Sequence, residues 1–135
     1  MYSIYHPLQK RNKKRNNIRV QDIADKLGVN MASSTLENSG KIIGSEAGIY
    51  SENSDIINYG NINGQIYGLW SKNDNIFNES GNIFGDDTGI TMKSSDLNNK
   101  GDIAGNNNGI ISVGSKISNY GTVSGKNTGI LSNED

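Results

Sequence analysis

The amino-acid sequence predicts an all-β protein, a parallel β-helix of about five coils with 20 residues in each. Three observations lead to this fold class: glycine recurs in three columns, aliphatic residues recur in three more, and an asparagine precedes the first glycine of each repeat. The period is 20 residues, with a single step of 21. Self-similarity at such a period is typical of a solenoid, in which each coil buries its apolar side only against its neighbours.

The glycine columns contain every one of the 17 glycines except Gly28 and Gly114. They are Gly40, Gly60, Gly81, Gly101 and Gly121; Gly44, Gly64, Gly85, Gly105 and Gly125; and Gly48, Gly68, Gly89, Gly109 and Gly129. The aliphatic columns are Leu36, Ile56, Ile76, Leu97 and Ile117; Ile42, Ile62, Ile83, Ile103 and Val123; and Ile49, Leu69, Ile90, Ile110 and Ile130. Aliphatic residues six or seven apart fit a three-sided coil with one inward anchor on each side.

Other solenoids fit the pattern less well. Helical repeats need longer units, and each glycine costs a helix about 1 kcal/mol relative to alanine. Leucine-rich repeats need aliphatic residues much closer together than they are here. Left-handed β-helices built on hexapeptides favour a period of about 18, so the longer coil favours the right-handed kind.

The asparagine column predicts a structural ladder. Side-chain amides stacked at the strand spacing of about 4.8 Å can each donate to the next side-chain carbonyl and so satisfy a buried polar group at a corner. Ordinary turn chemistry is the alternative, since Asn and Gly both tolerate positive φ. The column is Asn38, Asn58, Asn78, Asn99 and Asn119.

The N-terminal region differs from the repeats in its charge. Residues 1–35 carry seven Lys and Arg against two acids, whereas residues 36–135 carry six Lys against twelve acids. We expect residues 1–19, with the cluster from Lys10 to Arg15, to be a basic flexible tail; nucleic-acid binding or targeting is the alternative.

Residues 20–35 are expected to form an amphipathic helix that caps the solenoid. Val20, Ile23, Ala24 and Leu27 follow helical spacing, and Gly28 can end the helix. The stretch from Val20 to Asn30 also resembles the first helix and turn of the helix-turn-helix in lactose-repressor-type regulators. The following residues are too short and polar for a recognition helix, so a cap, which covers exposed strand edges, is preferred.

The repeats themselves, most completely from Ile56 to Leu69 and from Ile117 to Ile130, resemble those in the passenger regions of bacterial autotransporters and related surface adhesins. This resemblance implies a right-handed parallel β-helix that is secreted or displayed at the cell surface. No signal peptide and no C-terminal translocator is visible, which is a departure from that family. The expected function is an adhesin-like or structural passenger that binds a host protein or a glycan. The alternatives are a DNA-associated regulator that uses residues 20–30, and a phage or cell-surface glycan-processing β-helix.

Catalysis is not expected. The candidate cluster is Asp55, Asn75 and Asp96, which share one column, with Asp74 beside it and Lys116 next in line. We expect these groups at an outer corner, where a charged column is usually a solvated edge. Glycan-cleaving β-helices need a cleft walled by long loops, and the five coils differ in length by one residue. His6 is the only histidine, cysteine is absent and the calcium-binding nonapeptide is missing, so neither a metal site nor a cofactor is expected.

The candidate binding residues are Tyr50 and Trp70. They follow the third aliphatic column and should therefore point outward, in a column that continues as Thr91, Ile111 and Leu131. Exposed aromatics suit contact with a carbohydrate or a protein, and packing against the N-terminal segment or a second copy is the alternative.

The last coil, residues 117–135, has no following segment that resembles a cap. We expect its edge to be covered by a longer parent chain or by another stacked chain. No apolar run is long enough to span a membrane, and the net charge of −1 gives no general preference for nucleic acid.

Overall fold

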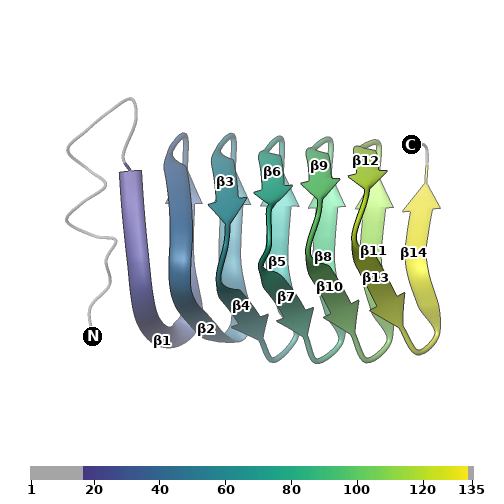
Figure 1. Ribbon diagram of the computed structural model, residues 1–135, viewed down its shortest axis with the longest axis horizontal. Coiled ribbons are helices and arrows are strands. Elements are labelled where there is room, and N and C mark those ends of the chain that lie inside the picture. Colours follow the sequence, from purple (N-terminus) through teal and green to yellow (C-terminus); the bar gives the residue numbers. More distant parts are fainter. Residues whose placement is uncertain (1–16, 134–135) are drawn as a thin grey trace.

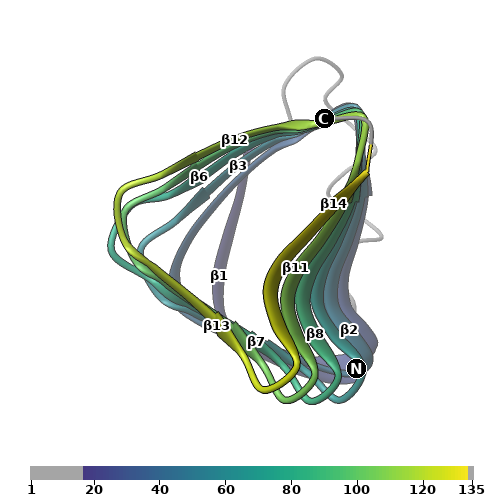
Figure 2. The same cartoon turned by 90° about the vertical axis from the view of Figure 1, so that its right-hand side faces the viewer.

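The computed structural model confirms the parallel β-solenoid (Figure 1). It describes the backbone of residues 17–133 and the side chains of residues 28–133. Figures 1 and 2 show strands that descend in front and ascend behind as the chain advances, which makes the coil right-handed. The strands are β1 (Asn17–Ala32), β2 (Thr35–Glu52), β3 (Asp55–Asn58), β4 (Asn61–Gly64), β5 (Tyr67–Lys72), β6 (Asn75–Asn78), β7 (Asn82–Gly85), β8 (Thr88–Lys93), β9 (Asp96–Asn99), β10 (Asp102–Gly105), β11 (Asn108–Val113), β12 (Lys116–Asn119), β13 (Thr122–Gly125) and β14 (Thr128–Asn133).

The cross-section is a triangle (Figure 2). The first face consists of β3, β6, β9 and β12, the second of β4, β7, β10 and β13, and the third of β5, β8, β11 and β14. The long strand β2 bends around all three faces and pairs with β3, β4 and β5 in turn. All the described pairings are parallel, and those among β2 to β14 join residues one repeat apart, as the period predicts.

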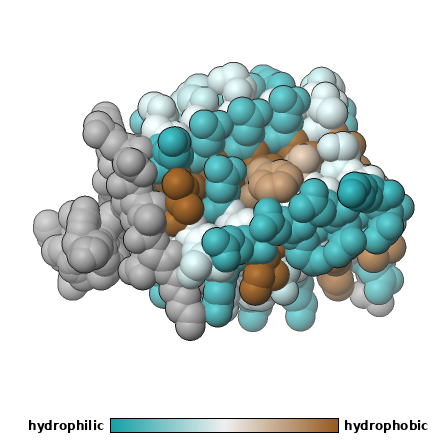
Figure 3. Space-filling model, turned by 90° about the horizontal axis from the view of Figure 1, so that it is seen from below, coloured by the Kyte–Doolittle hydropathy of each residue, from teal (hydrophilic) through white to brown (hydrophobic). Residues whose placement is uncertain are grey.

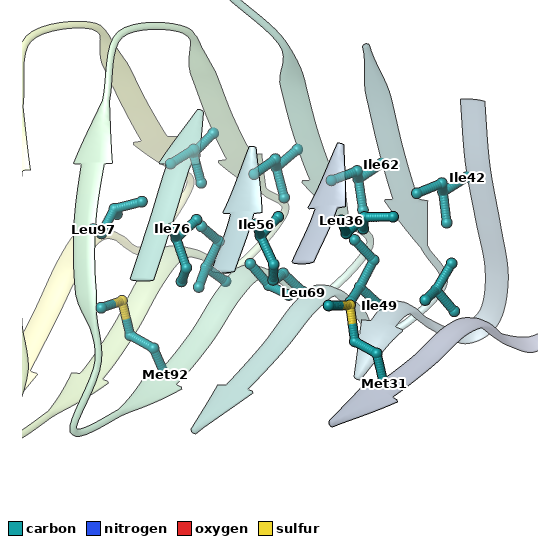
Figure 4. Close-up of a cluster of buried hydrophobic side chains, with 14 of the residues drawn as sticks. Met31, Leu36, Ile42, Ile49, Ile56, Ile62, Leu69, Ile76, Met92 and Leu97 are labelled. Carbon is teal, nitrogen blue, oxygen red and sulfur yellow. The ribbon is translucent and has the colours of Figure 1, made fainter. Parts of the chain in front are cut away.

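The core consists of the three predicted aliphatic columns (Figure 4). From Leu36 to Ile110 their members are at most 2% exposed. Each strand turns only one or two side chains inward, because successive residues alternate between the two sides of a strand. Isoleucine therefore stacks on isoleucine along the axis, and the contacts repeat from coil to coil.

The third face adds a second inward column that the sequence analysis did not identify. Its strands have six residues rather than four, so a further side chain points into the coil two residues after the aliphatic anchor. The column is mixed, with methionine at two levels and serine at three: Met31, Ser51, Ser71, Met92 and Ser112, all buried. The triangle therefore has a polar strip inside its third face.

The second glycine column is required by the tight turn between the second and third faces. At Gly85 an added Cβ would overlap the backbone carbonyl oxygen of Thr88, and the same overlap would occur at Gly44 and Gly64 with the residue three positions later. The obstacle is backbone, which cannot rotate away as a side chain can. These glycines are thus needed for the close approach of the chain to itself.

The helix predicted within residues 20–35 is wrong, and so is the helix-turn-helix-like interpretation of residues 20–30. Residues 20–32 lie in β1, which pairs in parallel with β2, and β2 begins at Thr35. Ile18, Ile23 and Val29 are in register with the column residues Leu36, Ile42 and Ile49, with irregularities between Val20 and Asp22 and between Asp25 and Leu27. A helix here would leave the backbone groups along the edge of β2 unpaired, whereas a strand satisfies them. Residues 17–32 therefore form an additional, irregular coil. The flexible tail was predicted over residues 1–19; residues 17–19 belong to β1, and residues 1–16 lie outside the described residues.

The last coil is more exposed than the coils before it. Ile117 and Val123 are only partly buried, and Ile130 is 39% exposed. The described part of the chain contains no helix that is long and apolar enough to cross a membrane.

Candidate functional site

The third face carries more large apolar side chains in its outward column than either of the other two faces. On β5 and its neighbours, the residue after the aliphatic anchor points outward because the residues on either side of it are buried. In register this column is Tyr50, Trp70, Thr91, Ile111 and Leu131. The second outward column of the face is mostly charged or polar: Glu52, Lys72, Lys93, Val113 and Asn133.

The outward columns of the other two faces carry two large apolar side chains each, Ile57 and Phe77 on the first face and Ile43 and Phe84 on the second. On the second face, the outward column runs Ile43, Asn63, Phe84, Ala104 and Ser124, so polar residues interrupt it. Figure 3, which views the molecule from below, shows hydrophobic patches separated by rows of hydrophilic side chains. On the first face, Ile57 and Phe77 are followed by Asn98 and Ser118.

Tyr50 and Trp70 form a stacked pair on the third face. Their ring centroids are 4.4 Å apart and their planes differ by 1°. The spacing matches the distance between adjacent strands, so the parallel sheet itself holds the two rings face to face. Both residues keep part of their surface exposed.

The stacking limits what the pair can bind. A sugar ring that packs on an aromatic residue needs a free ring face, and here each ring has one face covered by the other. The pair joins a phenol and an indole, which combine apolar ring carbons with a hydroxyl group and an N–H group. Such a rigid, amphipathic surface suits contact with a protein.

A second polar ladder, not predicted as such from the sequence, runs along the corner between the third and first faces. Each backbone N–H in this column donates to the side chain one coil further on: Ser34 N to Ser54 Oγ (3.1 Å), Ser54 N to Asp74 Oδ1 (2.8 Å), Asp74 N to Ser95 Oγ (3.0 Å) and Ser95 N to Ser115 Oγ (3.1 Å). The residue before each has positive φ, at Ser33, Asn53, Asn73, Ser94 and Gly114. The recurring Ser, Asn and Gly residues at the corner were the available sequence signal.

Asp74 is the only acid in this ladder and is 2% exposed. Its neighbours in the ladder are all serines. Burial raises the pKa of the Asp74 carboxyl above its ordinary value of 3.8, although hydrogen bonds from Ser71, Ser54 and other neighbours act to lower it.

The asparagine ladder is confirmed. Each Nδ2 donates to the Oδ1 of the next asparagine, from Asn38 to Asn58 (2.9 Å), Asn58 to Asn78 (2.9 Å), Asn78 to Asn99 (2.8 Å) and Asn99 to Asn119 (2.8 Å). The first four side chains are fully buried. At most levels the same side chain also bonds the nearby glycine backbone, as Asn58 does with the N–H and the C=O of Gly60. The ladder and the turn chemistry are therefore one arrangement, and its role is structural.

The column of candidate catalytic residues lies on the surface. Asp55, Asn75 and Asp96 are in register and exposed, and the Asn75 amide donates to Asp55 Oδ1 at 2.9 Å. Asp74 lies next to this column but points inward. Among the residues that the structure describes, no group of three or more His, Cys, Asp or Glu side chains is placed to hold a metal ion.

Comparison with known protein families finds no matching family, and comparison with curated proteins and with solved structures finds no match either.

Proposed function

We propose that this protein is a non-enzymatic binding scaffold that is secreted or displayed at a cell surface, in the manner of an adhesin, and that its third face binds a host protein. The observation that carries the proposal is the stacked pair Tyr50–Trp70, at one end of an outward column of large apolar residues. Aromatic residues held rigid by their backbone lose little conformational entropy when they bind, which is why they recur at protein interfaces.

The architecture also supports a binding role over catalysis. The connections between the strands of the described chain are at most three residues long, as from Asn78 to Asn82. Glycan-processing sites on β-helices need walls built from longer loops, together with acids clustered in a cleft. Short turns instead produce flat faces whose side chains repeat at a fixed spacing.

The proposal is tested by applying the labelled full chain to arrays of defined cell-surface and matrix proteins and, in parallel, to a glycan array. We expect saturable binding on the protein array, and a loss of about tenfold or more in the variant Tyr50→Ala/Trp70→Ala. Tyr120→Ala is the matched control, because Tyr120 is 74% exposed but lies on the corner between the first and second faces. Binding to glycans alone, or equal binding by the double variant and the wild-type chain, would refute the proposal.

A further inference from the structure

The hydrogen-bond chain around Asp74 contains one more contact than its hydroxyl groups can supply with hydrogens. Asp74 Oδ2 lies 2.6 Å from Ser71 Oγ, Ser71 Oγ lies 3.1 Å from Ser95 Oγ, and Ser95 Oγ lies 3.0 Å from the backbone oxygen of Lys93. Each of these three oxygen–oxygen contacts needs one hydrogen between its atoms. Ser71 and Ser95 have one hydroxyl hydrogen each, and the Lys93 carbonyl has none.

A proton on Asp74 completes the chain in one direction. The carboxylic acid donates from Oδ2 to Ser71, Ser71 donates to Ser95, and Ser95 donates to the Lys93 carbonyl. Ser95 Oγ has two lone pairs, so it can also accept the N–H of Asp74 at 3.0 Å. The other carboxyl oxygen, Oδ1, still accepts the N–H of Ser54. Every contact then has a donor and an acceptor.

The ionised carboxylate leaves one of the three contacts without a hydrogen. Ser71 must then donate to Asp74, and the single hydroxyl hydrogen of Ser95 can be donated either to Ser71 or to the Lys93 carbonyl, but not to both. The remaining oxygen pair is held close together inside the protein with lone pairs facing each other. A buried unmatched polar contact is costly, and an unpaired buried negative charge is more so.

Among the side chains that the structure describes, no charged one faces the carboxyl to compensate for its charge. The elements packed around it contribute uncharged groups: Ser51 from β2, Ser54 from the following turn, Ser71 from β5, and Met92 and Ser95 from β8 and its turn. The nearest charged residues on the same elements alternate outward or lie in the next, exposed column: Glu52, Lys72, Lys93, Asp55 and Asp96. The causes of the pKa change at Asp74 are accordingly burial and hydrogen bonds alone.

We propose that Asp74 is a pH-sensitive element of the solenoid: its carboxyl proton completes the hydrogen-bond chain at the corner between β5 and β6, and loss of that proton loosens this corner. The direction follows from linkage. The folded chain holds this proton more tightly than the unfolded chain, so its contribution is fully present below the ordinary pKa of 3.8 and is lost as the pH rises through the higher pKa of the folded state. The corner between β5 and β6 is thus more stable in acid, and this does not depend on which ligand the third face binds.

The experiment compares thermal unfolding of the full wild-type chain with that of Asp74→Asn across a pH series from acidic to alkaline. The amide can accept from Ser54 and donate to Ser71, so it reproduces the neutral acid and has no proton to lose. We expect the two melting temperatures to agree most closely in acid. As the pH rises, the melting temperature of the wild type should become lower than that of Asp74→Asn by about 4 °C or more. Asp96→Asn, at an exposed position, is the control and should follow the wild-type profile.

A second measurement does not depend on any variant. In the wild-type chain, the carboxyl ¹³C resonance of Asp74 should titrate above the ordinary aspartate pKa of 3.8. Titration of Asp74 at or below that pKa, or parallel pH profiles for wild type and Asp74→Asn, would overturn the proposal.

Discussion

Replacing Asn78 by alanine tests whether the asparagine ladder stabilises the fold. Asn78 lies in the middle of the ladder and is fully buried. Its side chain accepts from Asn58 and donates to Asn99 and to the Gly81 carbonyl, at 2.9, 2.8 and 3.1 Å. At about 1 kcal/mol for each net hydrogen bond, the direct loss is about 3 kcal/mol.

The neighbouring asparagines limit any further loss. Asn58 Nδ2 still donates to the Gly60 carbonyl, and Asn99 Oδ1 still accepts from the Gly101 N–H. The Gly81 carbonyl loses its side-chain partner, and a small cavity remains, so we expect a total of about 3–5 kcal/mol.

Urea unfolding, followed by far-UV circular dichroism and by the fluorescence of the single tryptophan, measures this loss. The matched control is Asn82→Ala, because the Asn82 amide makes a similar bond to Asn61 (3.1 Å) on the surface of the same coil. The control should cost less than about 0.5 kcal/mol. Equal losses of unfolding free energy for Asn78→Ala and Asn82→Ala would show that the buried ladder stabilises the fold no more than a surface hydrogen bond does.

Three further outcomes are expected. Ile83→Asp places a charge at a position that is 1% exposed, and it should lower the free energy of unfolding in urea by more than about 4 kcal/mol. Phe84→Asp, on the outer side of the same strand, should lower it by less than about 1 kcal/mol. An unchanged melting temperature for Ile83→Asp would contradict the assignment of the columns. Gly85→Ala should cost about 2 kcal/mol or more because its Cβ meets backbone, while Gly129→Ala, where the nearest atom is at 3.6 Å, should be nearly neutral by the same assay. Asp74→Ser restores the residue that the neighbouring coils carry, and calorimetry at neutral pH should show a higher melting temperature than for the wild type; a lower one would mean that the carboxyl is stabilising.

The N-terminal strand could not be predicted from the spacing of apolar residues alone. Val20, Ile23, Ala24 and Leu27 satisfy helical periodicity, but β1 is one coil of the solenoid with irregularities that shift its register. Those shifts hide the match to the repeat in a one-dimensional alignment. The unpaired edge of β2 decides the outcome, because parallel pairing satisfies a whole row of backbone groups at once.

The aromatic pair was predicted by position but not by geometry. Alternation along the strand is enough to place Tyr50 and Trp70 on the outside. Their face-to-face contact depends on the parallel register between β2 and β5 and on the rotamers that both side chains adopt. Neither can be predicted from a local sequence pattern. The contact covers one face of each ring, the kind of surface on which a sugar would pack.

The sequence by itself determined the parallel coil, the three aliphatic columns and the asparagine ladder. These features depend on the same residue type recurring at one interval, and in a parallel solenoid residues one repeat apart become direct neighbours. The tertiary structure decided the strand conformation of residues 17–32, the second inward column of the third face and the burial of Asp74. Each of these depends on where the chain bends at a corner and on which groups the next coil brings against it, and a single aspartate in a column of serines shows no periodicity from which its burial could be inferred.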